Sequence, residues 1–110
     1  MTLSKAQLQD LKLIKNSPKA LRKQLLKKLP RRAVKAICEC TLNVLKGTVP
    51  LSSYQKKSLR KYKTTLRKIG SKKGSLFAKK KLIIQHGGFL NILIPAALSV
   101  LTGIINGIRN

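Results

Sequence analysis

Side chains capable of acid, base or nucleophilic chemistry are few and scattered in this sequence of 110 residues. Asp10 and Glu39 are the only acidic residues, and they fall in different expected helices, so they form no carboxylate pair for general acid and base catalysis. His86 is the only histidine, and an isolated histidine is more often a structural or loop residue than a catalytic base. We therefore expect a protein that is not an enzyme.

The two cysteines, Cys38 and Cys40, offer little redox or metal chemistry. Two residues apart on a helix, their side chains diverge by about 200°. A single Cys-Glu-Cys together with His86 does not provide the four ligands of a structural zinc site. We expect reduced cysteines that pack, no disulfide framework, no metal and no cofactor.

Positive charge is the dominant property of the composition. The sequence has 25 Lys and Arg against 2 acidic residues, which gives a formal net charge of +23. Such a chain repels itself and attracts polyanions. Nucleic acid is the first candidate partner, because cations along phosphates release condensed counterions, and an anionic membrane is the second. A hydrophobic fraction of 43% is too high for a disordered tail, so we expect a folded domain.

The charge is concentrated in residues 52–81, which hold 12 basic residues and no acidic one. Lysine predominates there, and lysine acts as a point charge on phosphate, whereas base reading relies on Arg forks, Asn or Gln. We therefore expect binding that is independent of base sequence. The expected phosphate contacts are Lys56, Lys57, Arg60, Lys61, Lys63, Arg67, Lys68, Lys72, Lys73, Lys79, Lys80 and Lys81.

Double-stranded DNA is the favoured ligand, although these residues alone do not separate DNA from RNA. Stacking on single strands is not expected, because only Tyr54, Tyr62, Phe77 and Phe89 are aromatic and Tyr62 falls on an expected packing face. If half of the twelve cations contact phosphates, log affinity falls with log salt at a slope of roughly −5. A ribosomal or other RNA-scaffold protein would share the charge but not the long uncharged tail.

Capping signals and apolar spacing predict helices throughout residues 1–81. Ser4 and Gln7 form a capping-box pattern for a helix ending near Asn16, and Ser17 before Pro18 predicts the start of the next. A third helix is expected over residues 31–46, and a short one after a serine at position 75. Between them, Ser-x-x-Gln at residues 52–55 predicts one helix that continues to residue 69, with cations around its apolar face.

Residues 82–108 carry no formal charge, and residues 89–108 have the length of a membrane-spanning helix. A narrow polar stripe makes this segment weakly amphipathic. It could lie in a membrane interface, form a homo-oligomer through its Gly-x-x-x-Gly pattern, or pack against the other helices. The expected membrane or oligomer contacts are Phe89, Leu90, Leu93, Ile94, Leu98, Leu101, Gly103 and Gly107.

The expected fold class is all-α, a small cluster of short amphipathic helices with a hydrophobic C-terminal helix. It divides into a helical N-terminal module (1–51), a basic helix and linker (52–81) and an uncharged C-terminal helix (82–110). Gly87 and Gly88 lie shortly after the last charged residue, and they predict a hinge between the basic region and the apolar tail. No secretory signal is recognised at the N-terminus, so we expect an intracellular protein that is not secreted.

A lysine-rich segment that runs into Gln85-His86-Gly87-Gly88-Phe89-Leu90, followed by an apolar tail with Ile-Pro-Ala-Ala at residues 94–97, resembles the precursor of the adenovirus mu core protein. It is also similar to short basic proteins of adintoviruses and Maverick/Polinton transposons. The resemblance covers residues 72–108 for the mu family and extends over residues 31–110 for the transposon-related proteins.

The resemblance implies a viral or transposon core protein that condenses DNA in the nucleus or virion. A folded helical N-terminal half, which mu lacks, could bind DNA by shape or bind a capsid protein as well. In the mu family the maturation protease cuts after Gly-Gly, which places a candidate cleavage site here at Gly87, Gly88 and Phe89. The chain differs from mu in using Lys instead of runs of Arg and in having a helical N-terminal half. The alternative function is a membrane-active or membrane-anchored protein whose basic segment contacts anionic lipid.

Overall fold

The computed structural model describes residues 2–109, with side chains described for residues 2–100. Within these residues the chain forms helices, turns and loops and no strand, which confirms the all-α fold class. The elements in chain order are α1 (Lys5–Asn16), α2 (Lys19–Lys27), α3 (Arg31–Leu45), α4 (Ser53–Arg60), α5 (Lys63–Gly70), α6 (Leu76–Gln85), the short 3₁₀-helix η1 (Gly87–Phe89) and α7 (Leu90–Arg109).

Local capping chemistry sets the start of three helices as the sequence predicts. The Ser4 hydroxyl accepts a hydrogen bond from the Gln7 amide (3.1 Å), and the Gln7 side chain accepts one from the Ser4 amide (2.9 Å). Ser52 and Gln55 repeat this capping box with the same distances, and Ser75 caps α6 through its hydroxyl. These bonds satisfy amides that have no partner inside the first turn.

The start of α2 differs from the expectation. Ser17 does not cap α2: its hydroxyl donates to the Ile14 carbonyl (2.6 Å), and its amide donates to the same carbonyl (3.2 Å). Pro18 occupies the N-cap position instead, without a side-chain hydrogen bond, and the helix begins at Lys19. Ser17 therefore terminates α1 rather than initiating α2.

The segment expected as one helix over residues 52–69 is two helices, so the prediction of continuity was wrong. Tyr62 leaves the helical path (φ −101°, ψ 11°), and its amide donates to the Leu59 carbonyl in a tight turn (2.9 Å). The Tyr62 ring packs against Phe89, with ring centroids 5.9 Å apart. This remote aromatic contact accompanies the break, after which α4 packs against α7 and α5 packs against α3.

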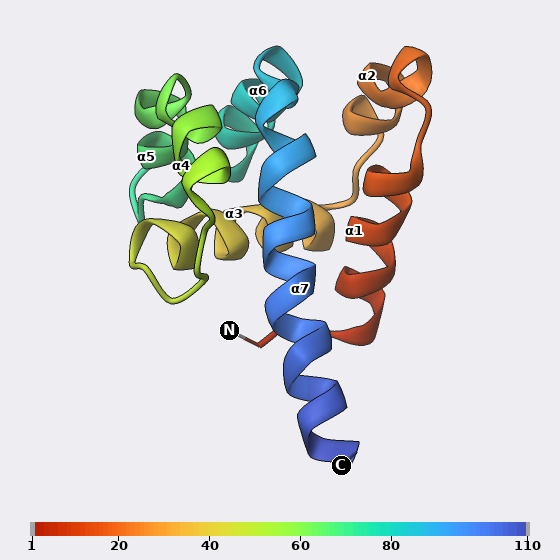
Figure 1. Ribbon diagram of the computed structural model, residues 1–110. Helices are drawn as coiled ribbons and strands as arrows, with labels where there is room; N and C mark the ends of the chain where they lie inside the picture. The colour runs from red at the N-terminus through yellow and green to blue at the C-terminus, as the bar shows by residue number, and fades with distance from the viewer. Residues whose placement is uncertain (1, 110) are drawn as a thin grey trace.

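Helix α3 lies at the centre of the fold and packs against α1, α5, α6 and α7 (Figure 1). Its end is set by Gly47, whose positive φ of 80° is a conformation that favours glycine. One continuous core contains residues from all three sequence segments, including Leu11, Ile37, Leu66 and Leu93. The segments therefore share a core.

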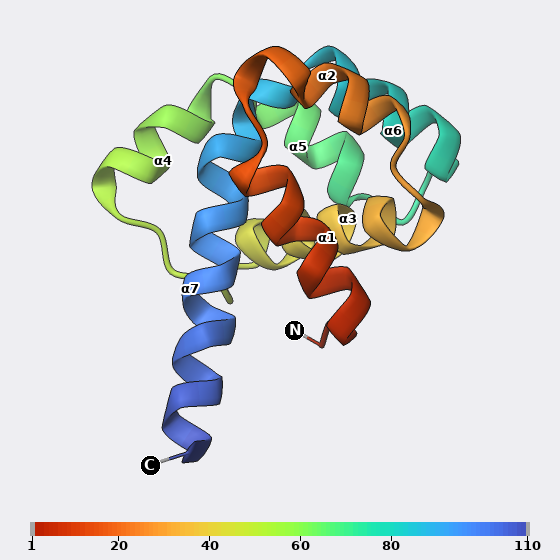
Figure 2. The ribbon, with the colours of Figure 1, turned by 90° about the vertical axis from the view of Figure 1, so that its right-hand side faces the viewer.

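Helix α7 gives the molecule its elongated shape. Its N-terminal part packs against α1, α3 and α4, and its C-terminal part extends beyond the other helices (Figures 1 and 2). The principal extents are 40 × 28 × 27 Å. The basic helices α4, α5 and α6 gather at the end of the molecule opposite the C-terminus (Figure 1).

Candidate nucleic-acid interface

The candidate interface follows α4, α5, α6 and the turns between them. Ten of the twelve basic residues expected to contact phosphates are exposed along these elements. We call this set the α4–α6 basic surface, and its members are Lys56, Lys57, Arg60, Lys61, Lys63, Arg67, Lys68, Lys72, Lys73 and Lys81.

Apolar anchors hold the three helices so that these cations face solvent. Leu59 of α4 is buried in the core, as are Leu66 and Ile69 of α5 and Ile83 of α6. Because each helix buries one apolar side, its lysines and arginines occupy the rest of the circumference. The break at Tyr62 directs the cations of α4 and α5 along two different helix axes rather than one stripe.

Neither acidic side chain forms an ion pair with this surface. Arg32 Nε donates to Asp10 Oδ2 (2.9 Å), the one ion pair within the part of the chain that the structure describes, and this bond and the charge of Asp10 raise the pKa of Arg32. Glu39 Oε1 accepts from Asn43 Nδ2 (3.1 Å) on α3. The α4–α6 basic surface therefore carries positive charge without a carboxylate paired to it.

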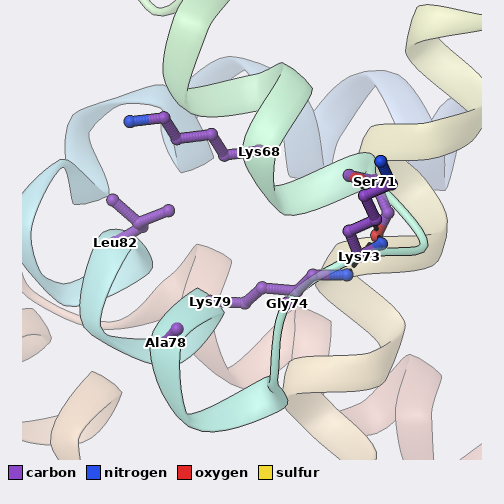
Figure 3. A pocket seen from close by; sticks show the side chains of 7 residues that line it. All are labelled: Lys68, Ser71, Lys73, Gly74, Ala78, Lys79 and Leu82. Carbon is purple, nitrogen blue, oxygen red and sulfur yellow. Dashed lines mark hydrogen bonds between the residues drawn. The ribbon is translucent and has the colours of Figure 1, made fainter.

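Lys79 is placed differently from the expectation, because it lies inside the structure. The side chain is only 9% exposed, and its ammonium donates to the Ser71 carbonyl across the turn between α5 and α6 (Figure 3). A cavity of about 300 Å³ lies beside it, lined by Lys68, Ala78 and Leu82 among others. The Lys68 ammonium points away from Lys79 in this view, so the lysines do not converge on a common point (Figure 3).

Lys80 is also partly withdrawn from the surface. Its ammonium donates to the Leu29 carbonyl (3.0 Å), which ties α6 to the segment between α2 and α3. Lys79 and Lys80 therefore hold α6 through backbone carbonyls, whereas the ten exposed cations remain free to meet phosphates.

The cysteines lie on α3 as free thiols. Cys40 is buried, and burial followed by the charge of Glu39 raises the pKa of its thiol to about 12. Burial also raises the pKa of Cys38, against a smaller lowering by the nearby Lys79 charge. Within the described residues, no group of three or more His, Cys, Asp or Glu side chains could hold a metal ion.

At the candidate cleavage site Gly87 is partly buried and Gly88 is exposed, but a side chain at either position would contact another element. A Cβ on Gly87 would lie 3.0 Å from Leu26, and a Cβ on Gly88 would lie 2.6 Å from the Tyr62 hydroxyl. Phe89 is 0% exposed and packs against the Tyr62 ring. The pair therefore fits a tight junction between α6 and α7, rather than a hinge between independent units.

The expected membrane or oligomer contacts fall mostly in the core. Phe89, Leu90, Leu93, Ile94 and Leu98 are all buried, against α1, α3 and α4. Of the three alternatives for this segment, packing against the other helices is the one seen here. The remaining members, Leu101, Gly103 and Gly107, lie outside the residues whose side chains are described.

Within the described residues, no single helix has both the length and the apolar composition needed to cross a membrane. Only a bent pair, Leu76–Gln85 with Gly87–Val100, meets these criteria jointly, and its two parts make an angle of 81°.

The sequence interpretation expected no stacking site among the aromatic residues, but two of them, Tyr54 and Phe77, are exposed. Helical spacing carries a signal for Phe77, because Lys80 and Lys81 lie three and four residues later and so share its side of α6. Comparison of the chain with protein-family models, with curated proteins and with solved structures gives no match.

Proposed function

We propose that this protein is a non-enzymatic nucleic-acid-binding protein that neutralises and compacts duplex DNA without reading its base sequence. The α4–α6 basic surface carries the proposal, because its ten exposed cations have no carboxylate paired to them. Lysines on short helices held by a common core present point charges to phosphates from more than one direction. Such an arrangement favours contact with more than one stretch of backbone, and hence compaction.

Salt dependence tests whether this surface makes the phosphate contacts. We compare the full chain with a variant in which Lys57, Lys63, Lys68 and Lys72, all exposed, are changed to Gln. Each lost phosphate contact reduces the slope of log affinity against log salt by about 0.9, so the slope becomes shallower by about 3 to 4. The measurement is the Kd for a random-sequence duplex between about 50 and 200 mM salt.

The matched control removes the same number of charges from α1 and α2, outside the α4–α6 basic surface. It changes Lys5, Lys12 and Lys15 of α1 and Lys23 of α2 to Gln, and all four are exposed. We expect this variant to keep most of the original slope. Equal losses in the two variants would mean that binding follows net charge alone, and a slope shallower than about −2 for the unmodified protein would contradict phosphate neutralisation.

The resemblance to adenovirus mu-type proteins suggests a setting for this activity, namely a core or packaging protein of a virus or transposon, in the nucleus or virion. It also suggests cleavage between Gly88 and Phe89. Because Phe89 is buried, the junction must open locally before a protease can engage it. Incubation with a cognate adenovirus-type protease should give slow cleavage that mild denaturant accelerates, and an intact chain under both conditions would contradict the proposal.

A second candidate function is membrane activity, favoured by the uncharged run at residues 82–108 that follows the lysines of α6. Leu90, Leu93, Ile94 and Leu98 of α7 are buried in the folded protein, so these residues must leave the core before they can meet lipid. The test compares the rate of dye release from anionic vesicles by the unmodified protein and by a variant with a destabilised core. If α7 must leave the core, the destabilised variant should release dye faster.

A further inference from the structure

Phe77 is the feature that the proposed function does not yet use. Its side chain is 68% exposed, although the other phenylalanine, Phe89, is fully buried. It lies in the first turn of α6, where the neighbouring Leu76 packs against the core and the Ser75 cap fixes the helix start. The Phe77 ring does not pack in the core, so it is accessible to a ligand.

The ring borders a hollow with an aliphatic floor and cationic edges. This hollow has a volume of about 190 Å³ and lies between α6 and the chain around the start of α3. Figure 2 shows α6 beside the segment that joins α2 to α3. The lining residues are Leu29, Arg31, Val34, Leu76, Phe77 and Lys80.

One cation lies over the ring, and another borders the hollow. The Lys81 ammonium lies 4.7 Å from the Phe77 ring centroid, and exposed Arg31 borders the hollow from α3. The bond from Lys80 to the Leu29 carbonyl holds the two walls together. The hollow is therefore preorganised by a tertiary contact, while Arg31 and Lys81 remain available to a charged ligand.

We propose that Phe77 and this hollow form a stacking site for an unpaired base of a single-stranded nucleic acid. The base stacks on the Phe77 ring above the aliphatic floor. The Lys81 ammonium moves from the ring to an adjoining phosphate, and Arg31 contacts another phosphate. This inference rests on the proposed function and extends it, since a base in an intact duplex is already stacked on its neighbours. The site tolerates any base, because every base has a π face.

A membrane is the weaker explanation for the same surface. Aromatic residues that anchor proteins at lipid interfaces are mainly Trp and Tyr, whose polar tips reach the headgroup level, and Phe77 has no such tip. A ring beside an open hollow, with one cation over the ring and another at the border of the hollow, suits a flat ligand that carries negative charge. The α4–α6 basic surface would then bind backbone, while Phe77 distinguishes single strands from duplex.

The full chain allows a direct test, because it contains no tryptophan. Phe77→Trp introduces a single fluorophore at the site. We expect its emission to be quenched by a single-stranded oligothymidine but much less by an abasic strand of equal length, which has the phosphates without bases. A duplex of the same length should also quench weakly.

Binding affinity provides the second readout. Phe77→Ala and Phe77→Leu should each weaken binding to the oligothymidine by about 10-fold, in the range that aromatic deletions cause, and change binding to the abasic strand and the duplex less than about 2-fold. Leu21→Ala, at another exposed apolar residue, is the control and should change none of these affinities. Circular dichroism checks that all variants keep their helices.

The outcomes separate this inference from the proposed function. Losses confined to strands that contain bases support the stacking site. Unchanged affinities, or equal losses for abasic, duplex and base-containing ligands, overturn it and leave duplex binding standing. Absence of binding by the unmodified protein to any nucleic acid overturns both. If the fluorescence of the Phe77→Trp variant responds to anionic vesicles but not to oligothymidine, the surface is assigned to lipid instead.

Discussion

Tyr62 connects the basic segment to the start of α7. Its ring packs against Phe89, its hydroxyl faces Gly88, and the Lys61 ammonium lies 5.3 Å from its ring centroid. A residue with no predicted role beyond helix packing thus lies at the break between α4 and α5 and also contacts the junction before α7. The junction depends on the absence of a side chain at Gly88.

Gly88→Ala should reduce the free energy of unfolding by about 1 to 3 kcal/mol, because Gly88 is exposed but the Tyr62 ring, packed against Phe89, must shift to admit a Cβ. A new Cβ would lie 2.6 Å from the Tyr62 hydroxyl, whereas the next ring atom, Cζ, is 3.6 Å away. Tyr62→Phe removes the hydroxyl, so the alanine should cost under about 1 kcal/mol in that background. Urea unfolding of the unmodified protein, the two single variants and the double variant measures the coupling energy between Gly88 and Tyr62. If the alanine lowers the free energy of unfolding equally with Tyr62 and with Phe at that position, the clash is not the cause.

At the scale of elements, α7 is a core helix along the part whose side chains are described. Leu93→Ala should reduce the free energy of unfolding by about 2 to 5 kcal/mol, because Leu93 is fully buried and the truncation leaves a cavity. Ser99→Ala, on the exposed side of the same helix, should change it by less than about 0.5 kcal/mol. Thermal or urea unfolding followed by circular dichroism checks both, and similar values would show that α7 does not pack as described.

The same core controls the alternative membrane function. Ile37→Ala in α3 loosens the helix that α7 packs against while leaving the sequence of α7 unchanged. If α7 acts on lipid after leaving the core, this variant should release dye from anionic vesicles faster than the unmodified protein. Equal rates, or no leakage from either protein, would count against membrane activity of α7.

Sequence patterns predicted the elements wherever the determining contact is local. The capping boxes at Ser4 and Ser52 involve residues three apart, so their signal lies within one helical turn. The break at Tyr62 escaped prediction because its partner, Phe89, is remote in sequence. Ser17 was assigned to the wrong helix, since a hydroxyl between two helices can bond to either end.

The candidate interface shows the same division between local and tertiary information. Composition located the basic segment, and ten of its twelve cations are exposed. It did not reveal the inward positions of Lys79 and Lys80, because these depend on carbonyls of Ser71 and Leu29 that only the folded chain brings near. A helical wheel could have predicted that Phe77 is exposed, because it places Phe77 on the same side of the helix as Lys80 and Lys81.

At the scale of the whole molecule, a net charge of +23 is confined within a radius of gyration of 13.3 Å. Folding brings these charges closer than in the expanded chain, so their repulsion opposes the compact state. The Debye length is about 8 Å at physiological ionic strength and about 30 Å at 0.01 M, so the repulsion extends across the molecule only at low salt. Stability should therefore rise with salt, while DNA affinity falls.

The two four-lysine variants separate these effects. Each lowers the net charge by four, from +23 to +19, and each removes exposed lysines from two helices or their adjoining turn. Both should be more stable than the unmodified protein at low salt, by similar amounts, because the self-repulsion depends on total charge. Only the variant in α4, α5 and the following turn should lose a large part of its DNA salt slope.

Thermal unfolding at about 10 mM and about 150 mM salt measures the stability of the three proteins under weak and strong screening. If the two variants instead differ strongly in stability, the charges act on folding through local contacts rather than through total charge. The cations of the α4–α6 basic surface would then affect folding as well as DNA binding.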